Sequence, residues 1–345
     1  MMRRTGRSLA ALSLGVCLLM TSGANGIHAQ SSNYTFTSVV QVGDPPPGQG
    51  EYRFSRLGGP QVNNQGDLLF GGLREIYLRR QGHIQRVAQR GDPSPLGPTI
   101  DAFRGRGLND QGEVLFGTRL TDQRQALSLV TAAALRTVVS TSQFMPTGGQ
   151  VEEIFGSALN NQGAVAFFAT LRGGSSATGI FLVFGDTIRT VVASGQSSPL
   201  GGVFQYTFPP HLDLNDRGEV TFVGEITGGS VPDGLFLFRD GTIEPLVARG
   251  DSTPVGGQFN HTHRPQINNR GQVLFEASLS GAPVRDGVFV WSEGAIRKVV
   301  ALGDVTPIGG RFLEFDVTES PGGIVGPPNL QQPGTSGVCR GDRRG

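Results

Sequence analysis

The sequence predicts an all-β tandem-repeat protein, a β-propeller-like array of five full four-stranded repeats plus an incomplete sixth closed by the N-terminal strand. Two observations lead to this prediction. One short segment recurs five times at a spacing of about 50 residues, and the apolar runs between its copies are short and bounded by glycine-rich turns. A unit of that length suits a four-stranded propeller sheet better than a helical hairpin or a short solenoid coil.

The recurring segment is Asn-Asx-x-Gly followed by an apolar strand that contains a phenylalanine. Its first residues lie 46, 51, 55 and 53 positions apart, at Asn63, Asn109, Asn160, Asn215 and Asn268. Asn and Asp side chains hydrogen-bond to nearby backbone groups, and glycine adopts positive φ without steric cost. Each copy is therefore predicted to be a hairpin turn.

The strand after each turn is predicted to be buried on both faces. In the third copy Val165 and Phe167 point one way and Ala166 points the other, and all three are apolar. Such a strand needs cover on both sides, as when sheets are stacked around an axis. The equivalent phenylalanines are Phe70, Phe116, Phe167, Phe222 and Phe275.

Each repeat continues with a second strand, as at residues 179–182, and a third, as at residues 243–248. A linker follows, clearest at residues 250–259, and its last residues begin the fourth strand. At the two ends, residues 39–44 match a final strand and linker, and residues 311–318 match the first strand of a sixth repeat. We expect residues 38–42 to pair with residues 311–318, because each alone would leave an unpaired edge.

The run from Asn160 to Phe167, with its four relatives, resembles the NxxGxxAF tandem repeat of exported bacterial proteins whose molecular role is not established. The resemblance covers residues 39–315 and is most specific in the turn. It implies an extracytoplasmic repeat protein, and members of such families commonly end in an anchoring segment. The tail of this chain departs from that pattern, so surface attachment is not predicted.

The first 29 residues have the layout of a secretory signal peptide. Three arginines precede an apolar run from Leu9 to Met20, and small residues precede Ala29. The run is too short to span a membrane, so we expect cleavage after Ala29, with residues 24–26 as an alternative site. A lipoprotein signal at Cys17 and a twin-arginine signal fit the residues less well. The mature protein is therefore expected to be secreted or periplasmic, without a membrane span.

The rest of the chain is predicted to form a repeat domain at residues 30–318 and a disordered tail at residues 319–345, rich in Gly, Pro, Gln and Arg. Loss of the three leader arginines lowers the formal charge from +1 to about −2, which implies no nucleic-acid partner. Cys339 would remain as the one cysteine, which excludes an internal disulfide. We expect a monomer whose partner is an unknown protein or polysaccharide.

Three groups of residues could each have a specific function. Arg-Gly-Asp triplets at residues 90–92, 249–251 and 340–342 could serve cell adhesion, but the first two fall in the linker, where Gly-Asp recurs without arginine. The turn at residues 213–219 could offer oxygen ligands to calcium, although Arg217 stands where an oxygen is needed. His261 and His263 could begin a metal site if His211 or His83 joined them. We interpret these features as a repeat by-product, an Asx turn and a surface pair.

No catalytic, cofactor-binding or metal-binding residue is predicted, because the sequence has no nucleophile elbow, zinc-protease motif, phosphate loop or dinucleotide fingerprint. We predict a non-catalytic extracytoplasmic binding or scaffold module. The alternative is a propeller enzyme of hydrolase or lyase type, with a site at the central channel mouth. Convergence of the polar residues that break the repeat symmetry would favour a pocket, and scatter would favour a binding surface. These residues are Arg104, Arg106, Glu152, Glu153, Tyr206, His211, His261, His263 and Arg264.

Overall fold

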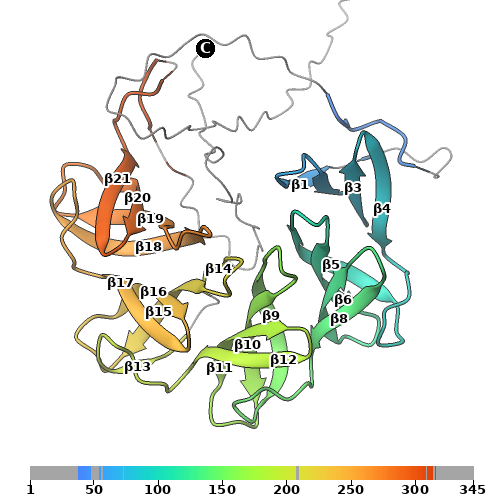
Figure 1. The fold of residues 1–345 in the computed structure, drawn as a ribbon, viewed down its shortest axis with the longest axis horizontal. Coiled ribbons are helices and arrows are strands. Elements are labelled where there is room, and N and C mark those ends of the chain that lie inside the picture. The colour runs from blue at the N-terminus through green and yellow to red at the C-terminus, as the bar shows by residue number, and fades with distance from the viewer. Residues whose placement is uncertain are drawn as a thin grey trace, which may run out of the picture.

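The computed structural model describes residues 38–47, 54–55, 57–72, 74–206, 210–307, 309–313 and 315. The described part is all-β and contains five antiparallel sheets that follow one another along the chain. Figure 1 shows them side by side in an arc around a common axis, with the first and fifth sheets at its two ends. The predicted propeller-type repeat architecture is therefore confirmed.

The five sheets share one order of strands. The first consists of β1 (Gly58–Val62), β2 (Leu68–Gly71), β3 (Glu75–Arg80) and β4 (His83–Gln89). The second consists of β5 (Ile100–Leu108), β6 (Val114–Leu120), β7 (Gln125–Val130) and β8 (Leu135–Ser140). The third consists of β9 (Gln150–Leu159), β10 (Val165–Arg172), β11 (Thr178–Phe184) and β12 (Thr187–Ala193). In each, consecutive strands are neighbours.

The fourth sheet departs slightly from this plan. Its first strand is divided into β13 (Val203–Phe204) and β14 (Leu212–Leu214), which both pair with β15 (Val220–Thr227), followed by β16 (Asp233–Arg239) and β17 (Thr242–Ala248). The fifth sheet is regular, with β18 (Gln258–Ile267), β19 (Val273–Ser280), β20 (Asp286–Ser292) and β21 (Ala295–Ala301). In Figure 1, β1, β5, β9, β14 and β18 lie nearest the middle of the arc. We call these the inner strands.

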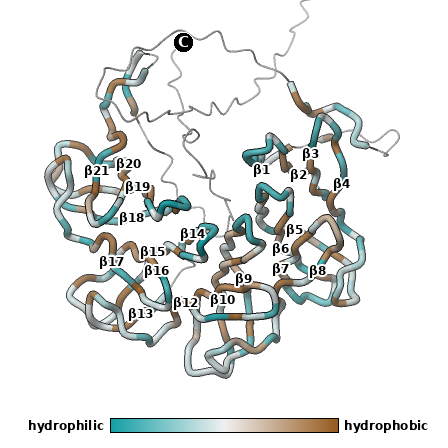
Figure 2. Tube along the Cα trace, viewed as in Figure 1, coloured by the Kyte–Doolittle hydropathy of each residue, from teal (hydrophilic) through white to brown (hydrophobic). Residues whose placement is uncertain are grey.

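Alternate residues of one strand pack into two different apolar cores, as the sequence predicts. In β10, Val165, Ala166 and Phe167 are all 0% exposed. Val165 and Phe167 pack with the second sheet, whereas Ala166 packs with the fourth. One apolar core thus lies between each pair of neighbouring sheets. Figure 2 shows the apolar residues in the strands and hydrophilic residues in many of the turns. The five equivalent phenylalanines are at most 2% exposed, as predicted: Phe70, Phe116, Phe167, Phe222 and Phe275.

The sheets are joined by linkers that all close in the same way. In the clearest copy the N–H of Gly250 donates to the carbonyl of Phe259 at 2.8 Å, and the N–H of Phe259 donates to the carbonyl of Asp251 at 2.9 Å. The carboxylate of Asp251 accepts from the N–H of Ala248. The same pattern begins at Gly43, before the first sheet, and at Gly303, after the fifth. Both predicted end pieces thus contain a linker loop.

The expected closing strand is not seen in the described residues. Residues 38–42 form no strand, and of their predicted partner, residues 311–318, only 311–313 and 315 are described. Arg311 bridges back to Val305 instead. The predicted signal peptide at 1–29 and tail at 319–345 lie outside the described residues. The described part contains no helix long and apolar enough to cross a membrane.

Candidate functional site

The Asn-Asx-x-Gly turns are tight hairpins, as predicted. In the third copy the Oδ1 atom of Asn160 accepts from the backbone N–H groups of Gln162 and Ala164, at 3.0 and 2.8 Å. Gly163 has a φ of +73°, a conformation that L side chains rarely adopt. The amide oxygen therefore holds the turn, and the glycine permits it.

The other half of the same amide joins neighbouring sheets, which the sequence interpretation missed. The Nδ2 atom of Asn160 donates to the backbone carbonyl of Asn215, in the next turn, at 2.9 Å. Each of Asn63, Asn109 and Asn215 does the same toward the turn that follows it, at 2.9 to 3.1 Å. We call this row the asparagine ladder. Only Asn has both an acceptor and a donor at this length, because Asp lacks the donor.

A second row runs beside the ladder through the residue that follows each asparagine. The N–H of Asn161 donates to the Oδ1 atom of Asp216 at 2.7 Å, and its side-chain amide donates to both Asp110 and Asp216. We call this row the alternating row, because Asn and Asp take turns along it. Its members are Asn64, Asp110, Asn161, Asp216 and Asn269. Each acid thus lies between two amides. Their order could have been read from the sequence.

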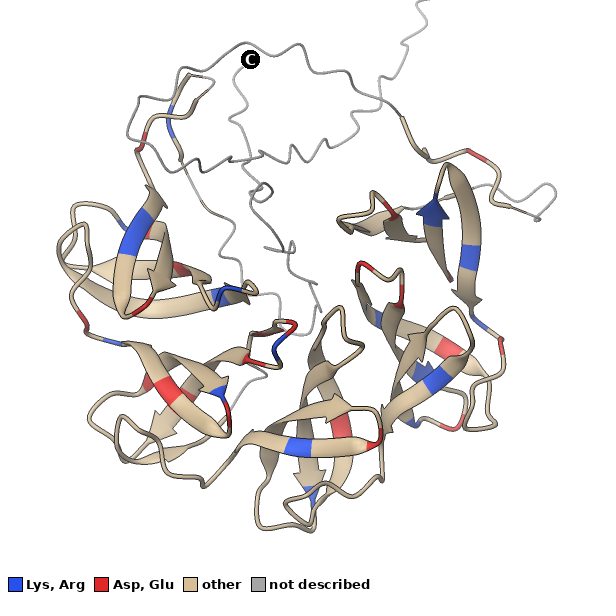
Figure 3. Ribbon diagram, viewed as in Figure 1, with Lys and Arg blue, Asp and Glu red and all other residues tan. Residues whose placement is uncertain are grey.

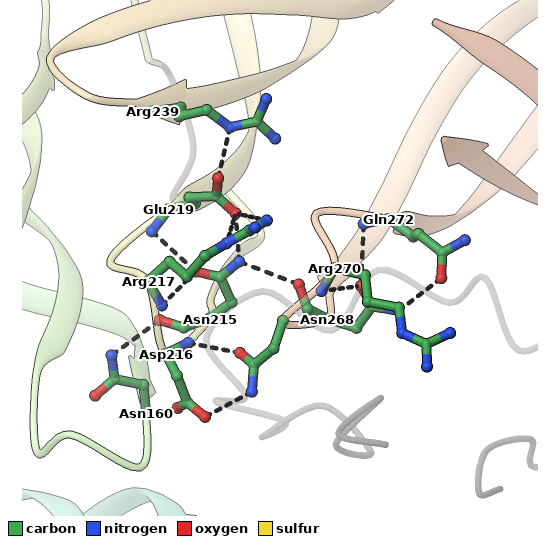
Figure 4. Close-up of polar contacts among 10 residues, drawn as sticks. Asn160, Asn215, Asp216, Arg217, Glu219, Arg239, Asn268, Arg270 and Gln272 are labelled. Atoms are coloured by element: carbon green, nitrogen blue, oxygen red, sulfur yellow. Dashed lines mark hydrogen bonds and ion pairs between the residues drawn. The ribbon is translucent and has the colours of Figure 1, made fainter. Parts of the chain in front are cut away.

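The acidic turn considered for calcium is part of this network (Figure 4). The carboxylate of Glu219 accepts hydrogen bonds from Asn215, Arg217 and Arg239. Burial alone would raise the pKa of Glu219, but these three donors outweigh it and hold the pKa below its ordinary value. The carboxylate is therefore neutralised by cations and amides. Among the described residues, no group of three His, Cys, Asp or Glu could hold a metal ion.

The Arg-Gly-Asp triplets are likewise part of the scaffold where they are described. The carboxylate of Asp92 accepts from the N–H of Gln89 at 2.9 Å, as Asp251 does in its own linker. Arg249 contacts Asp233 and His261. The third triplet, residues 340–342, lies outside the described residues. Charged side chains are otherwise spread over all five sheets, as Figure 3 shows.

The inner strands of the first, second, third and fifth sheets carry a β-bulge four residues before the ladder asparagine. In the first and second sheets the bulge residue is Gly59 or Gly105, with φ of +58° and +51°. The third sheet also has glycine there, Gly156. In the fifth sheet the residue is Arg264, which has a φ of +45°. In the fourth sheet the equivalent position is His211, which directly precedes β14 and is not part of a bulge. Glycine is thus replaced by a polar side chain in two adjacent sheets.

Arg264 is therefore held in a conformation that costs a non-glycine residue about 1 to 2 kcal/mol. Such strain persists only where the surroundings impose it, and it is concentrated at binding and catalytic sites. Arg264 lies 3.9 Å from Glu276 on β19. An ordinary structural role would be filled by glycine, as in the first two sheets, so the arginine side chain is the feature to explain.

The histidines that were candidates on sequence grounds come together beside Arg264. The rings of His211 and His263 are 6.4 Å apart and nearly perpendicular, and those of His261 and His263 are 6.1 Å apart. We call His211, His261, His263 and Arg264 the inner polar cluster. His83 is not part of it, because it begins β4 in the first sheet.

Two residues after His211 lies a buried acid, Asp213, which the sequence interpretation had placed in a calcium-like turn. Its Oδ2 atom accepts from the backbone N–H of Ile267, in the fifth sheet, at 2.8 Å. Burial raises the pKa of Asp213 to about 7, although the N–H groups of Ile267 and Leu214 donate to it and oppose the shift. Asp213 therefore fixes the inner strand of the fifth sheet to that of the fourth.

The remaining symmetry-breaking residues lie elsewhere. Glu152 and Glu153 are exposed on β9, and Arg104 is exposed on β5, where Arg106 also lies. Tyr206 is buried with its ring 5.5 Å from that of Phe168, and burial, followed by the charge of Glu225, raises its pKa well above the ordinary value. A hollow of about 320 Å³ between the second and third sheets is lined by none of them. Of the nine residues, three histidines therefore come together, with Arg264 next to one of them in the chain, and the other five are spread over the second to fourth sheets.

With this architecture in view, the chain can be placed in a family. A family model covers residues 73–322, so the chain belongs to the family of unknown function DUF7453. No curated protein matches the sequence.

Solved propeller-type structures resemble the chain at low similarity. A protein described as a gluconolactonase has 14% identity and a TM-score of 0.36, with 69% of this chain and 74% of that chain covered. The tricorn protease has 13% identity and a TM-score of 0.41, with 84% and 26% covered. A Bacteroides thetaiotaomicron protein of unknown function has 13% identity and a TM-score of 0.37, with 76% and 62% covered. The chain thus spans less than two thirds of the last two.

Proposed function

We propose that this chain is a non-catalytic extracytoplasmic binding module that recognises a polysaccharide through the inner polar cluster. One observation carries the proposal. Four residues before the ladder asparagine, glycine gives way to His211 and Arg264 in two adjacent sheets, and Arg264 keeps the positive φ of Gly59 and Gly105. The fold holds this side chain through Glu276, at 3.9 Å, but glycine would form the bulge without strain, so a ligand is the better reason for an arginine there.

The chemistry of the cluster suits a hydroxyl-rich ligand. Imidazole rings donate and accept hydrogen bonds, and a guanidinium donates several in a fixed plane. His211 and His261 are exposed, while His263 and Arg264 are half-buried and held in place by the neighbouring ring and carboxylate contacts. The expected export of the chain would bring this surface to polysaccharides outside the cytoplasm.

A second candidate, an enzyme, is favoured by one observation. The pKa of Asp213, about 7, lies in the range of an effective general acid or base. Against this function, the Asp213 side chain is buried and its carboxylate is engaged by the N–H of Ile267. That position suits a clamp between two sheets better than a group that meets a substrate.

Binding of the purified protein to a panel of glycans and cell-envelope polysaccharides tests the proposal. We expect retention of at least one polysaccharide, and at least a tenfold loss of affinity in both Arg264→Ala and His211→Ala. His83→Ala is the matched control, because His83 is an exposed histidine on an outer strand. Equal binding by all three variants would refute the site. Release of shorter saccharides during incubation would favour the enzyme.

A further inference from the structure

The two end sheets of the arc each present an unfilled face. We call the face of a sheet toward the next sheet in the chain its trailing face, and the opposite face its leading face. In the fourth sheet the trailing residues Leu235 and Leu237 are 0% exposed. The equivalent residues of the fifth sheet, Val288 and Val290, are only half-buried. Among the described residues, the trailing face of the fifth sheet therefore lacks the cover that the other four have.

The leading face of the first sheet is open at its inner strand, whereas Phe70 and Tyr77 on the same face are buried against Phe54. Val62, just before the ladder asparagine, is 61% exposed, whereas its counterparts Leu108, Leu214 and Ile267 are at most 6% exposed. In each internal interface the trailing columns of one sheet pack against these leading columns of the next. The two ends are thus the two halves of one more interface of the same kind.

The asparagine ladder gives this interface a direction. Each side-chain amide donates to the turn of the following sheet. At the fifth sheet, within the described residues, the amide of Asn268 donates only inside its own turn, to Gln272. At the first sheet, no described side-chain amide donates to the carbonyl of Asn63. Among the described residues, the inter-sheet hydrogen bond is therefore unmade at both ends, although the carbonyl of Asn63 accepts from the N–H of Gly66 in its own turn.

The alternating row has the same polarity. The N–H of Asp216 donates to the side chain of Asn269, but the N–H of Asn269 has no acceptor among the described residues. The Oδ1 atom of Asn64 likewise accepts nothing there. Because both end members are asparagines, joining them would bring together two neutral amides and would not place two carboxylates side by side.

A buried hydrogen-bond acceptor on the fifth sheet also indicates that, among the described residues, a neighbouring sheet is missing on its trailing face. Gln266 is the counterpart of Asp213, whose carboxylate accepts from the backbone of the next inner strand. Gln266 is only 9% exposed, and its Oε1 atom is buried without a hydrogen-bond donor among the described residues. A leading inner strand on this face would supply a backbone N–H in the corresponding place, that of Val62.

We infer that a second copy of this chain docks head-to-tail, with the leading face of its first sheet on the trailing face of the fifth sheet. The occupant is set by the four internal interfaces, which show what covers a trailing face of this sequence. The same chain carries that cover at its other end. Such an interface is heterologous, so copies can continue to add until a ring closes or a filament forms. This inference is independent of the ligand proposed above.

Two substitutions test the inference in the full chain. Val62→Asp disables the leading face and Val290→Asp disables the trailing face, while Phe184→Asp, at a residue 60% exposed elsewhere, is the control. In sedimentation we expect the wild type and the control to associate as concentration rises. Each single variant should stay monomeric. An equimolar mixture of the two should form a dimer, because one intact face of each kind remains.

Three results would overturn the inference: a monomeric wild type at all concentrations, association of either single variant, or a mixture that stays monomeric. A wild type in which the chain's own residues cover the fifth sheet would give the first result. If an aspartate variant melts below the wild type, hydrogen exchange of the wild type decides. Exchange at residues 58–62 and 286–292 must slow as concentration rises, and unchanged exchange counts against docking.

Discussion

The side-chain amide of Asn160 in the third sheet donates to the backbone carbonyl of Asn215 in the fourth, 55 positions later in the chain, while its oxygen holds its own turn. One side chain thus fixes both a hairpin and the position of the next sheet.

Replacing Asn160 by Asp should separate these two roles. The acceptor remains and the donor is lost, which leaves a buried carboxylate facing the carbonyl of Asn215. We expect the free energy of unfolding to fall by about 1 to 3 kcal/mol in denaturant titrations. The control is Gln162→Glu, the same chemical change at an exposed position of the same turn. Equal stability of the two variants would show that the inter-sheet bond contributes nothing.

Phe167→Ala tests the apolar core between the second and third sheets. Phe167 is fully buried and packs against Phe181 at a ring distance of 5.6 Å. We expect a loss of about 3 to 5 kcal/mol of unfolding free energy, since the cavity adds to the lost transfer energy. Phe184→Ala, at an exposed position of the same sheet, should change it by less than about 0.5 kcal/mol. An unchanged melting curve for Phe167→Ala would be incompatible with this packing.

Titration of Asp213 should make the free energy of unfolding depend on pH. Its pKa is about 7 in the folded protein and near 3.8 when unfolded. Between those values the unfolded chain releases the proton and the folded chain keeps it, so stability falls as pH rises from 4 to 7. A shift of this size corresponds to at most about 4 kcal/mol.

Asp213→Asn removes that titration and keeps an oxygen that can accept from Ile267. We therefore expect the difference in unfolding free energy, variant minus wild type, to increase from pH 4.5 through pH 6 to pH 7.5. For Asp186→Asn, at an exposed turn residue, the unfolding free energy should change with pH as it does in the wild type. A constant difference between Asp213→Asn and the wild type at all three pH values would disprove the buried titration.

Backbone strain at Arg264 should be measurable as a difference between two truncations. Both Arg264→Gly and Arg264→Ala remove the side chain and its contact with Glu276, but only glycine adopts a φ of +45° freely. We expect the glycine variant to be more stable than the alanine variant by about 1 kcal/mol, with ligand binding lost in both. Equal unfolding free energies would mean that the bulge stores no strain.

The sequence allowed the repeat, the turns and the two-faced burial of residues such as Val165 and Ala166 to be predicted, because these depend on local chemistry and on period-two alternation. The asparagine ladder escaped prediction because its partners are a whole repeat apart and single-turn reasoning already explained each Asn. The signal was nevertheless present: aligning the repeats on Asn63 and its equivalents shows the Asn/Asp alternation beside it.

The inner polar cluster was predictable only in part. Aligning the inner strands shows glycine at Gly59 and Gly105 where Arg264 stands, so the broken column can be read from the sequence. That His211 lies beside His263, and that Asp213 is buried and bonded to Ile267, depends on how the fourth and fifth sheets pack. The predicted pairing of residues 38–42 with residues 311–318 failed to appear in the described part, where residues 38–42 form no strand.

The alternation of amide and acid in the row that contains Asn161 and Asp216 imposes a rule of parity on the array. Inserting or deleting one sheet would set two acids or two amides next to each other, whereas a change by two sheets preserves the order. Two adjacent acids repel, but two adjacent amides do not. Duplications in such an array should therefore be tolerated in pairs, and an odd-numbered ring must contain one amide–amide junction.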